Sequence, residues 1–360
     1  MNTHDVATRG GPAPLVSVVI PAYNAGSTLE ETLGSLLAQT YPNIEIIVVN
    51  DGSSDTTADV LRAFGNKVQP IYQTNSGLPV ARNTGCLVAV FDIIALIDAD
   101  DLCEPNRVAV QICALRNCPD AVLCTSDFSA FSQNGPVSAS YGSTYYSMIA
   151  DSAHGLRALY PNYLQIKTDN TSCAGTQDVN APIDAYTGNV YRQLVHGNFV
   201  HPPTVMFRRN LLETAGLFDE GLSSTCDWEW LVRASRKGDF VHIKQSLLRY
   251  RLSPNQMSLK HRAHGVNALE ILRTLEKIFE SDPDLLQTNY ARIRRHRGNI
   301  NNDVAYALAG NDKIRSAVFL ARGVWLNRKI GFNTLKILLR IIAPAWLARW
   351  LRRGAPHGPT

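Results

Sequence analysis

The chain has 360 residues, and its 45% hydrophobic and 18% charged residues are ordinary for a globular protein. This length predicts one α/β domain of enzymatic size with a helical appendage, and we expect no nucleic-acid partner. The formal charge of +4 is unevenly distributed, since the segment from Lys313 to the end holds ten Lys or Arg and no Asp or Glu. Residues 1–312 therefore carry a charge of −6, and the basic character belongs to the C-terminal tail.

Residues 1–14 are polar, rich in Gly and Pro, and lack the apolar core of a signal peptide. We therefore expect a disordered leader in a cytoplasmic protein. The seven cysteines are odd in number and form no CxxC pair, and Cys86, Cys113 and Cys124 lie in apolar runs. This usage predicts buried, reduced thiols rather than disulfides or a zinc site.

Strand patterns recur at regular intervals through the first hundred residues. Apolar runs rich in β-branched residues predict strands at Val16–Ile20, Ile44–Val49, Val68–Tyr72 and Ile93–Ile97. Helical patterns separate these runs. This alternation predicts a parallel sheet with right-handed crossover connections.

Three helices are predicted between the strands. Leucines at helical spacing indicate a first helix, which a capping box of Ser27 and Glu30 would open. Asp55 is placed to cap a second helix. Asn75–Gly77 opens a third helix, and this helix carries Arg82.

An acidic cluster follows the last predicted strand. Ile93–Ile97 runs directly into Asp98, Ala99, Asp100 and Asp101, at the carboxyl edge where open α/β sheets place their ligands. Three neighbouring carboxylates cannot all ionise cheaply unless a cation or hydrogen-bond donors share the site. A divalent metal held by one or two of them and by substrate phosphates fits this need. The alternative is a polar surface turn.

Polar residues also follow two other predicted strands, at Tyr23–Asn24 and at Asp51. Such a rim suits a nucleotide, because an Asp can accept from a base N–H, an aromatic ring can face the base and Arg82 can meet phosphate. Neither GxGxxG nor GxxxxGK[ST] occurs at these turns, which disfavours dinucleotide and P-loop binding. Taken singly, Asp51 could be a turn residue and Arg82 a solvated helix charge.

Four ordered motifs span this half of the chain. They read Val16-Ser-Val-Val-Ile-Pro-Ala-Tyr-Asn24, Val48-Val-Asn-Asp51-Gly-Ser-Ser-Asp55, Asn75-x-Gly77 with Ala81-Arg82-Asn83-x-Gly85, and Asp98-Ala-Asp100-Asp101. Together they resemble the family 2 glycosyltransferases. The resemblance implies the GT-A fold, which is an α/β fold with a Rossmann-like, mostly parallel sheet flanked by helices, here with a C-terminal helical region.

The resemblance also implies a chemistry and a set of site residues. It implies inverting transfer from a nucleotide-diphosphate sugar, with UDP as the expected nucleotide and Mg²⁺ or Mn²⁺ as the metal. Asp100 would bind that metal, and Asp101 is a secondary candidate. Donor-binding roles fall to Pro21, Ala22, Tyr23, Asn24, Asp51, Asn75, Arg82, Asp98 and Ala99.

The pattern weakens between residues 127 and 199, where Ser, Gly, Asn and Tyr are frequent. We expect either a long irregular insertion or short elements joined by loops. His201–Arg209 and Gly216–Glu220 resemble the segment that precedes the acceptor-side helix of the family. Farther on, Leu248–Arg251 resembles its closing strand, followed by the polar residues Asn255, Gln256 and Ser258.

Asp227 lies at the start of a predicted helix, Cys226–Arg233. An Asp at a helix N-terminus is normally a cap, whereas the resemblance favours a general base that takes the proton of an acceptor hydroxyl. The Glu-Asp pair usual in the family is Cys226-Asp227 here. Glu229 would lie on a different face of the helix and is a secondary candidate.

Beyond Lys260 the pattern is helical, with helices predicted over residues 266–279, 290–308 and 314–326. The tail, Leu335–Arg353, is apolar but too often interrupted by charges and Pro344 to span a bilayer, which needs about 20 apolar residues. We expect interfacial helices with Trp346 and Trp350 near the lipid headgroups. The alternative is a basic-rimmed helix packed on the acidic surface of the body.

The sequence thus predicts a leader (1–14), a GT-A domain (15–260) and a basic helical region (261–360). Within the domain, residues 15–126 would bind the nucleotide sugar and 127–260 the acceptor. We expect an inverting, metal-dependent glycosyltransferase of the bacterial cell-surface polysaccharide type, acting on a glycan or lipid-linked acceptor and peripheral on the inner face of the membrane. The alternatives are a nucleotidyltransferase and a catalytically dead sugar-nucleotide-binding or scaffold protein.

Overall fold

The computed structural model describes residues 14–167, 182–253, 266–288, 290–310 and 312–342. The chain forms two compact units, Met1–Ser253 and Pro254–Thr360. The predicted leader, the residues Asn255, Gln256 and Ser258, and the tail tryptophans Trp346 and Trp350 lie outside the described residues, leader residue 14 excepted.

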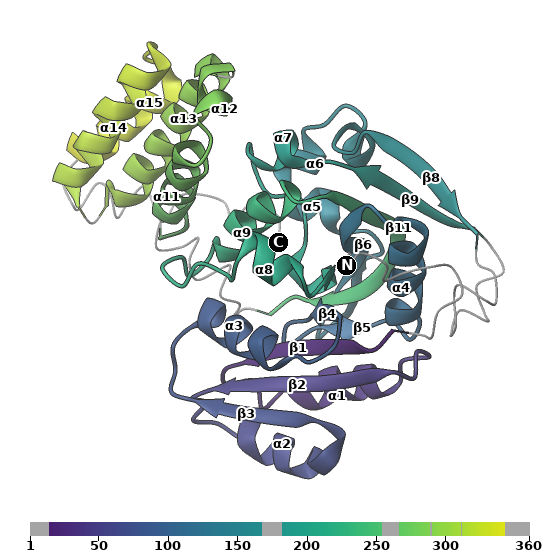
Figure 1. Ribbon diagram of the computed structural model, residues 1–360. Coiled ribbons are helices and arrows are strands. Elements are labelled where there is room, and N and C mark those ends of the chain that lie inside the picture. Colours follow the sequence, from purple (N-terminus) through teal and green to yellow (C-terminus); the bar gives the residue numbers. More distant parts are fainter. Residues whose placement is uncertain (1–13, 168–181, 254–265, 289, 311, 343–360) are drawn as a thin grey trace. The chain divides into compact units, whose positions relative to one another are not determined.

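The first half of the sheet in unit 1 is the parallel array that the sequence predicts (Figure 1). Strand β1 (Val16–Ala22) lies between β2 (Ile44–Asp51) and β4 (Ile93–Leu96), and β3 (Gln69–Gln73) lies beyond β2. Strands β1 and β4 are buried along their whole length, which explains why their sequences read as continuous apolar runs.

Three helices connect these strands: α1 (Leu29–Leu37), α2 (Thr57–Phe64) and α3 (Leu78–Val88). Helix α3 packs on β1 and β2, and it comes so close that a Cβ on Gly85 would lie 2.4 Å from a Val19 methyl. The capping box predicted at Ser27 is wrong. Helix α1 has Thr28 at its N-cap, and the Thr28 hydroxyl donates to the backbone oxygen of Ala99 at 3.0 Å instead of capping the helix.

The second half of the sheet is mixed. Strand β10 (Met206–Arg208) runs antiparallel between β4 and β6 (Ala121–Ser132), and β11 (Asp239–Arg251) lies parallel to β6. The hairpin of β8 (Asn162–Ile166) and β9 (Ile183–Gly188) extends the sheet beyond β11. Strand β5 (Leu102–Cys103) pairs with β11 and β7 (Gly135–Ser138) with β6, so the described residues form an eleven-stranded sheet.

Short elements rather than one irregular insertion fill the region of weak pattern. Helices α5 (Gly142–Tyr145), α6 (Ser147–Ala150) and α7 (Tyr191–Leu194) accompany the β8–β9 hairpin. The remaining helices of unit 1 are α4 (Arg107–Asn117), α8 (Leu211–Ala215) and α9 (Cys226–Ser235), with 3₁₀ turns at Gly65–Lys67, Gly155–Ala158 and Pro202–Thr204. Helix α4 packs against β6 and β11.

Among the cysteines that the structure describes, one departs from the prediction. Cys86, Cys103, Cys118, Cys124 and Cys226 are free and buried. Cys113, on α4, is disulfide-bonded, so the expectation of a reduced thiol is wrong at this position. Sequence spacing could not reveal this bond, because cysteines far apart in the chain become neighbours only in the folded structure.

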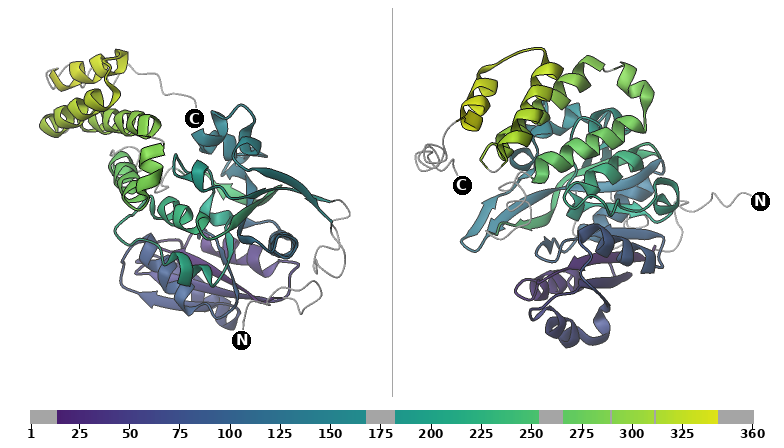
Figure 2. Two further views of the ribbon diagram at one scale, coloured as in Figure 1. Left: turned by 45° about the horizontal axis from the view of Figure 1, so that its top comes forward. Right: turned by 90° about the vertical axis from the view of Figure 1, so that its left-hand side faces the viewer.

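Unit 2 is helical, as predicted. It contains α11 (Val266–Glu280), α12 (Pro283–Thr288), α13 (Tyr290–Leu308), α14 (Lys313–Asn327) and α15 (Phe332–Ile342), which Figure 2 shows from two further directions. Ala305, Leu320 and Ile337, from three of these helices, form a buried cluster. No helix in the described part of the chain is both long and apolar enough to cross a membrane.

Candidate functional site

The ends of β1, β2 and β3 lie at one edge of the sheet, and Asp51 at the end of β2 ties β3 and the start of α3 to it. Asp51 is 3% exposed, and its carboxylate accepts hydrogen bonds from the Gln73 side chain (2.8 Å) and from the backbone N–H groups of Ser76 and Gly77 (both 2.9 Å). Gly77 is the N-cap of α3. A carboxylate offers about four acceptor positions, so one remains for a ligand donor.

The loop after β1 is fastened to the loop after β2. The backbone N–H of Asn24 donates to the Ser53 hydroxyl, and the Asn24 side-chain oxygen accepts from the backbone N–H of Ser54, both at 2.9 Å. Gly52 has φ +71°, and a Cβ there would lie 2.6 Å from the backbone nitrogen of Asn75. The Tyr23 side chain between these ties is 55% exposed, so one face is open to a ligand ring.

Pro21 and Ala22 complete this part of the edge. They are the last residues of β1, both buried, and they pair in register with Val49 and Asn50 of β2. Their backbone is therefore fixed by the sheet.

The acidic cluster directly follows β4, beside β1. The backbone oxygen of Ala99 accepts from the hydroxyls of Thr28 and Thr32 on α1, each at 3.0 Å, which fixes the turn. Burial, reinforced by the neighbouring carboxylate of Asp98, raises the pKa of Asp100 to about 6. A cation beside Asp100 would favour its ionised form, which the Asp98 carboxylate opposes.

Asp101 lies in the protein interior and has a structural role instead. It is fully buried, and its carboxyl accepts from the backbone N–H of Arg251 on β11 at 3.0 Å. Burial, together with the charges of Asp100 and Asp98, raises its pKa well above the ordinary value. Its second oxygen has no hydrogen-bond partner. Asp101 therefore anchors the acidic turn to β11.

The side chains that could bind a metal suit a divalent ion only in part. No group of three or more His, Cys, Asp and Glu side chains gathers into a metal cage within the described ranges. Asp98 and Asp100 offer carboxylate oxygens whose mutual repulsion a divalent ion would neutralise. Mg²⁺ is commonly bound through one or two carboxylates plus substrate phosphates, so this pair fits a metal that arrives with a diphosphate.

Arg82 lies beneath this cluster. Its side chain is 3% exposed, and its Nη2 donates to Asp98 Oδ1 at 2.9 Å, while Asp98 itself is about one-third exposed (34%). Its Nε has no hydrogen-bond partner. Asn83, the next residue, joins α3 to the segment around Phe218, because its side chain exchanges hydrogen bonds with the backbone of Phe218.

Asp227 lies in the first turn of α9, but it is not the N-cap, which is Thr225. Its carboxylate accepts the backbone N–H of Trp228 at 2.8 Å, one of the N–H groups that a helix start leaves without an intrahelical partner. The indole N–H groups of Trp228 and Trp230 donate to the backbone oxygens of Leu194 (2.7 Å) and Gly216 (2.8 Å). These two anchors fix the helix that carries Asp227.

Arg82 is the common neighbour of Asp98 and Asp227. Burial alone would lower the pKa of Arg82, but the Asp98 carboxylate, with Cys226 and Asp227, outweighs it and raises that pKa. Burial raises the pKa of Asp227, and the Arg82 charge opposes this rise. Three charged groups from α3, the β4 turn and α9 thus share one electrostatic environment.

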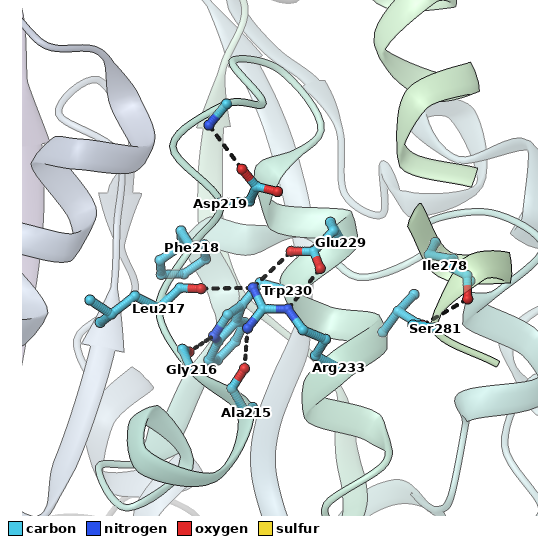
Figure 3. A network of polar contacts seen from close by, with 12 residues as sticks. Ala215, Gly216, Leu217, Phe218, Asp219, Glu229, Trp230, Arg233, Ile278 and Ser281 are labelled. Carbon is cyan, nitrogen blue, oxygen red and sulfur yellow. Dashed lines mark hydrogen bonds and ion pairs between the residues drawn. The ribbon is translucent and has the colours of Figure 1, made fainter. Parts of the chain in front are cut away.

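Glu229 has a different environment from Asp227. Figure 3 shows it paired through both carboxylate oxygens with Arg233. Each of these two hydrogen bonds is 2.7 Å long. Arg233 also donates to the backbone oxygens of Leu217 (2.7 Å) and Ala215. The pair therefore joins α9 to the segment that follows α8.

An aromatic cluster lies close to these charged groups, and the sequence reasoning did not find it. His201 stacks on Phe128 with ring centroids 3.9 Å apart, and Tyr145 and Tyr250 meet it edge-on. Burial, followed by the Arg82 charge, lowers the pKa of His201 to about 3. Burial is the main cause of the raised pKa of the neighbouring Tyr146, and the carboxylates of Asp227 and Asp98 contribute to it. The available signals were the tyrosine-rich composition of residues 127–199 and the family-like segments that contain His201 and Tyr250.

This fold, with acidic residues at the carboxyl ends of parallel strands and a mixed second half, is the GT-A fold of nucleotide-sugar-dependent enzymes. Residues 17–214 match the profile of "Glycosyl transferase family 2", more than half of the chain. The chain therefore belongs to this family and is a glycosyltransferase.

Relatives of this chain carry the same description. It is 28% identical over 306 residues to the uncharacterized glycosyltransferase RP339 of Rickettsia prowazekii, covering 84% of this chain and 83% of that protein. It is 27% identical over 274 residues to the uncharacterized glycosyltransferase YibD of Escherichia coli, covering 73% and 70%. Among solved structures, the mannosyltransferase PcManGT of Pyrobaculum calidifontis, in complex with GDP-Man and Mn²⁺, superposes with a TM-score of 0.50 at 18% identity, covering 98% and 91%; this likeness concerns the fold.

Proposed function

We propose that the chain is an inverting, metal-dependent glycosyltransferase that moves a sugar from a nucleotide-diphosphate sugar to a hydroxyl group of a glycan or lipid-linked acceptor. The observation that carries this proposal is the position of Arg82, whose buried guanidinium neighbours both Asp98 and Asp227. This cation is paired with a carboxylate of the nucleotide-sugar half and interacts electrostatically with one of the acceptor half. Transfer requires that the residues that bind the donor and those that bind the acceptor lie close together at one reaction centre.

The donor would bind along the carboxyl edge of the sheet. Asp51 has one acceptor position left for a base N–H, and the exposed ring of Tyr23 can face the base. Pro21, Ala22, Asn24 and Asn75 would shape this base pocket through backbone fixed by the sheet and the loop ties. UDP is the expected nucleotide.

Asp98, Ala99 and Asp100 would meet the sugar and the diphosphate. The raised pKa of Asp100 favours a metal here, because a bound divalent ion stabilises the ionised carboxylate. When bound, the metal supplies positive charge to the leaving diphosphate. Asp98, held by Arg82, is oriented for a sugar or ribose hydroxyl.

Asp227 would act as the general base. Burial raises its pKa from the ordinary carboxyl value, which makes the carboxylate a better proton acceptor near neutral pH. The acceptor oxygen attacks the anomeric carbon, the bond from that carbon to the diphosphate oxygen breaks, and the hydroxyl proton passes to Asp227. A single displacement of this kind inverts the anomeric configuration. Asp101 and Glu229 would support the site from behind rather than take part in chemistry.

We infer that the acceptor belongs to cell-surface polysaccharide synthesis of the bacterial type and that transfer takes place at the inner face of the cytoplasmic membrane. The support is the basic, anion-free tail of the chain, which would bring the enzyme to an anionic lipid surface where a lipid-linked acceptor lies.

A donor screen tests the proposal. Purified full-length chain is incubated with UDP-sugars and GDP-sugars, and nucleotide-diphosphate release is measured with Mg²⁺ or Mn²⁺ and again with EDTA. We expect metal-dependent release from at least one UDP-sugar. Release of pyrophosphate would instead indicate a nucleotidyltransferase, and donor binding without any turnover would indicate a sugar-nucleotide-binding protein.

A further inference from the structure

The last two helices of unit 2 differ from ordinary surface helices. One side of α15 packs inward, where Thr334 and Ile337 are buried and Ile341 packs against the cluster formed by Ala305, Leu320 and Ile337. A helix whose inner side already fills a core normally carries polar residues on its outer side.

The outer side of α15 is apolar instead. Phe332, Leu335, Leu339 and Ile342 are 82%, 52%, 69% and 69% exposed. Their spacing of three, four and three residues places them along one side of the helix. We call these four residues the α15 apolar face. Exposed rows of large apolar side chains of this kind mark interaction surfaces.

Two more large apolar side chains lie just before α15 in the chain. Trp325, near the end of α14, is 75% exposed, and Ile330, between the two helices, is 66% exposed. A tryptophan with an apolar ring system and one N–H donor is suited to the boundary between hydrocarbon and water.

The charged residues of α14, α15 and the loop between them are all basic. Arg322, Arg328, Lys329 and Lys336 are exposed, and the chain contains no Asp or Glu from Lys313 onward. Lys336 and Arg340 lie over the Tyr306 ring on α13, at 6.0 and 4.0 Å from its centroid, and so flank the α15 apolar face.

We propose that the α15 apolar face, with Trp325 and Ile330, is a docking surface for a bilayer that contains anionic lipid. Apolar side chains would enter the boundary between headgroups and acyl chains while the surrounding Lys and Arg contact lipid phosphates. The idea that this bilayer also carries a lipid-linked acceptor rests on the proposed function. A second copy of the chain fits less well, because two such surfaces would bring cations against cations.

Flotation of the full-length protein with phosphatidylcholine vesicles, with and without phosphatidylglycerol, tests the proposal. We expect binding to the anionic vesicles and much weaker binding to the neutral ones. The variant Leu335→Gln/Leu339→Gln should bind at least about tenfold more weakly at every salt concentration, because it removes apolar area. The matched control Leu87→Gln/Val90→Gln changes two apolar residues of unit 1 that are 61% and 70% exposed, and it should bind like wild type.

A charge variant separates the two contributions. Arg322→Gln/Lys329→Gln should weaken binding by about fivefold per cation at low salt, and this effect should fade as salt rises. Unchanged vesicle binding of the Leu335→Gln/Leu339→Gln variant, or no binding by the wild-type chain, would overturn the proposal. So would loss of a dimer in sedimentation velocity, or a large fall in Tm, when the α15 apolar face is changed, since either result means that protein covers it.

UDP release in solution is measured on the same preparations. All variants of unit 2 should retain it, because none alters a residue of the sheet edge. Vesicle binding without any donor turnover would refute the proposed function and leave the docking surface standing. Donor turnover without vesicle binding would refute the docking surface and leave the proposed function standing.

Discussion

Glu229 is the residue at which a structural role and a catalytic role predict opposite measurements. Its side chain is 11% exposed and is paired through both oxygens with Arg233, which also holds the backbone oxygens of Ala215 and Leu217. Asp227 lies two residues earlier on the same helix. We therefore expect Glu229→Gln to destabilise the fold while leaving the catalytic step nearly intact.

The expected loss of stability follows from these contacts. A hydrogen bond to a charged group contributes about 1.5–3 kcal/mol, and Gln keeps one of the two bonds while removing the charge. We expect the free energy of unfolding to fall by about 2 kcal/mol, which is less than the roughly 3–5 kcal/mol lost when a fully buried pair is broken, because Arg233 is 28% exposed. In a domain of this size that corresponds to a fall in Tm of roughly 4–8 °C.

Thermal denaturation and UDP-release kinetics of the same samples decide between the two roles. The control is Glu31→Gln, which breaks an exposed Glu–Arg pair with Arg251 and should cost less than about 1 kcal/mol. A large loss of kcat in Glu229→Gln at unchanged Tm would refute the structural interpretation and make Glu229 a catalytic candidate.

Three further predictions concern the sheet edge and the buried carboxyl groups. Asp100→Asn should weaken metal-dependent UDP binding and Asp51→Ala should weaken UDP binding with or without metal, and calorimetry showing UDP affinity unchanged in both variants would rule out the proposed donor site. Arg82→Met should move the acid limb of the kcat profile to higher pH, because the Arg82 charge lowers the pKa of Asp227, the group that must be ionised to accept a proton; a limb that stays in place or moves down in pH would contradict this. Asp101→Asn should leave Tm at neutral pH unchanged or higher. A carboxyl group whose pKa is raised on folding stabilises the fold at low pH, and this contribution is lost as pH rises through that pKa. A fall in Tm of several degrees would show that the ionised form is needed.

Short-range pattern was sufficient for the elements that frame the donor side. The strands before Tyr23, Asp51 and Asp98 are buried on both faces, so their apolar runs could be read directly from the sequence. The helices of unit 2 were equally predictable because their apolar residues recur at helical spacing.

The failures have a common cause, which is long-range contact. Ser27 and Glu30 have the spacing of a capping box, yet helix α1 starts one residue later and the Thr28 hydroxyl bonds the turn at Ala99, 71 positions along the chain. The Cys113 disulfide depends on a partner that spacing does not indicate.

The acceptor side was harder still. The stacking of Phe128 on His201 and the edge contact of Tyr250 combine three segments of the chain that no local pattern relates. Antiparallel β10, between β4 and β6, was likewise beyond prediction from alternation of strands and helices, because it enters the sheet from a distant part of the chain.

The most direct test of the central claim is the turnover of Asp227→Asn with the UDP-sugar that the donor screen identifies. Asp227→Asn should bind UDP with wild-type affinity and unfold at a similar temperature, but release UDP about 10²–10⁴-fold more slowly, which is the typical contribution of a positioned base. The matched control Asp59→Asn changes a solvent-exposed carboxylate that pairs only with Arg62 among the contacts found, and it should be fully active. Near-normal turnover of Asp227→Asn would contradict the account and leave Asp227 as a partner of the Trp228 N–H at the start of α9.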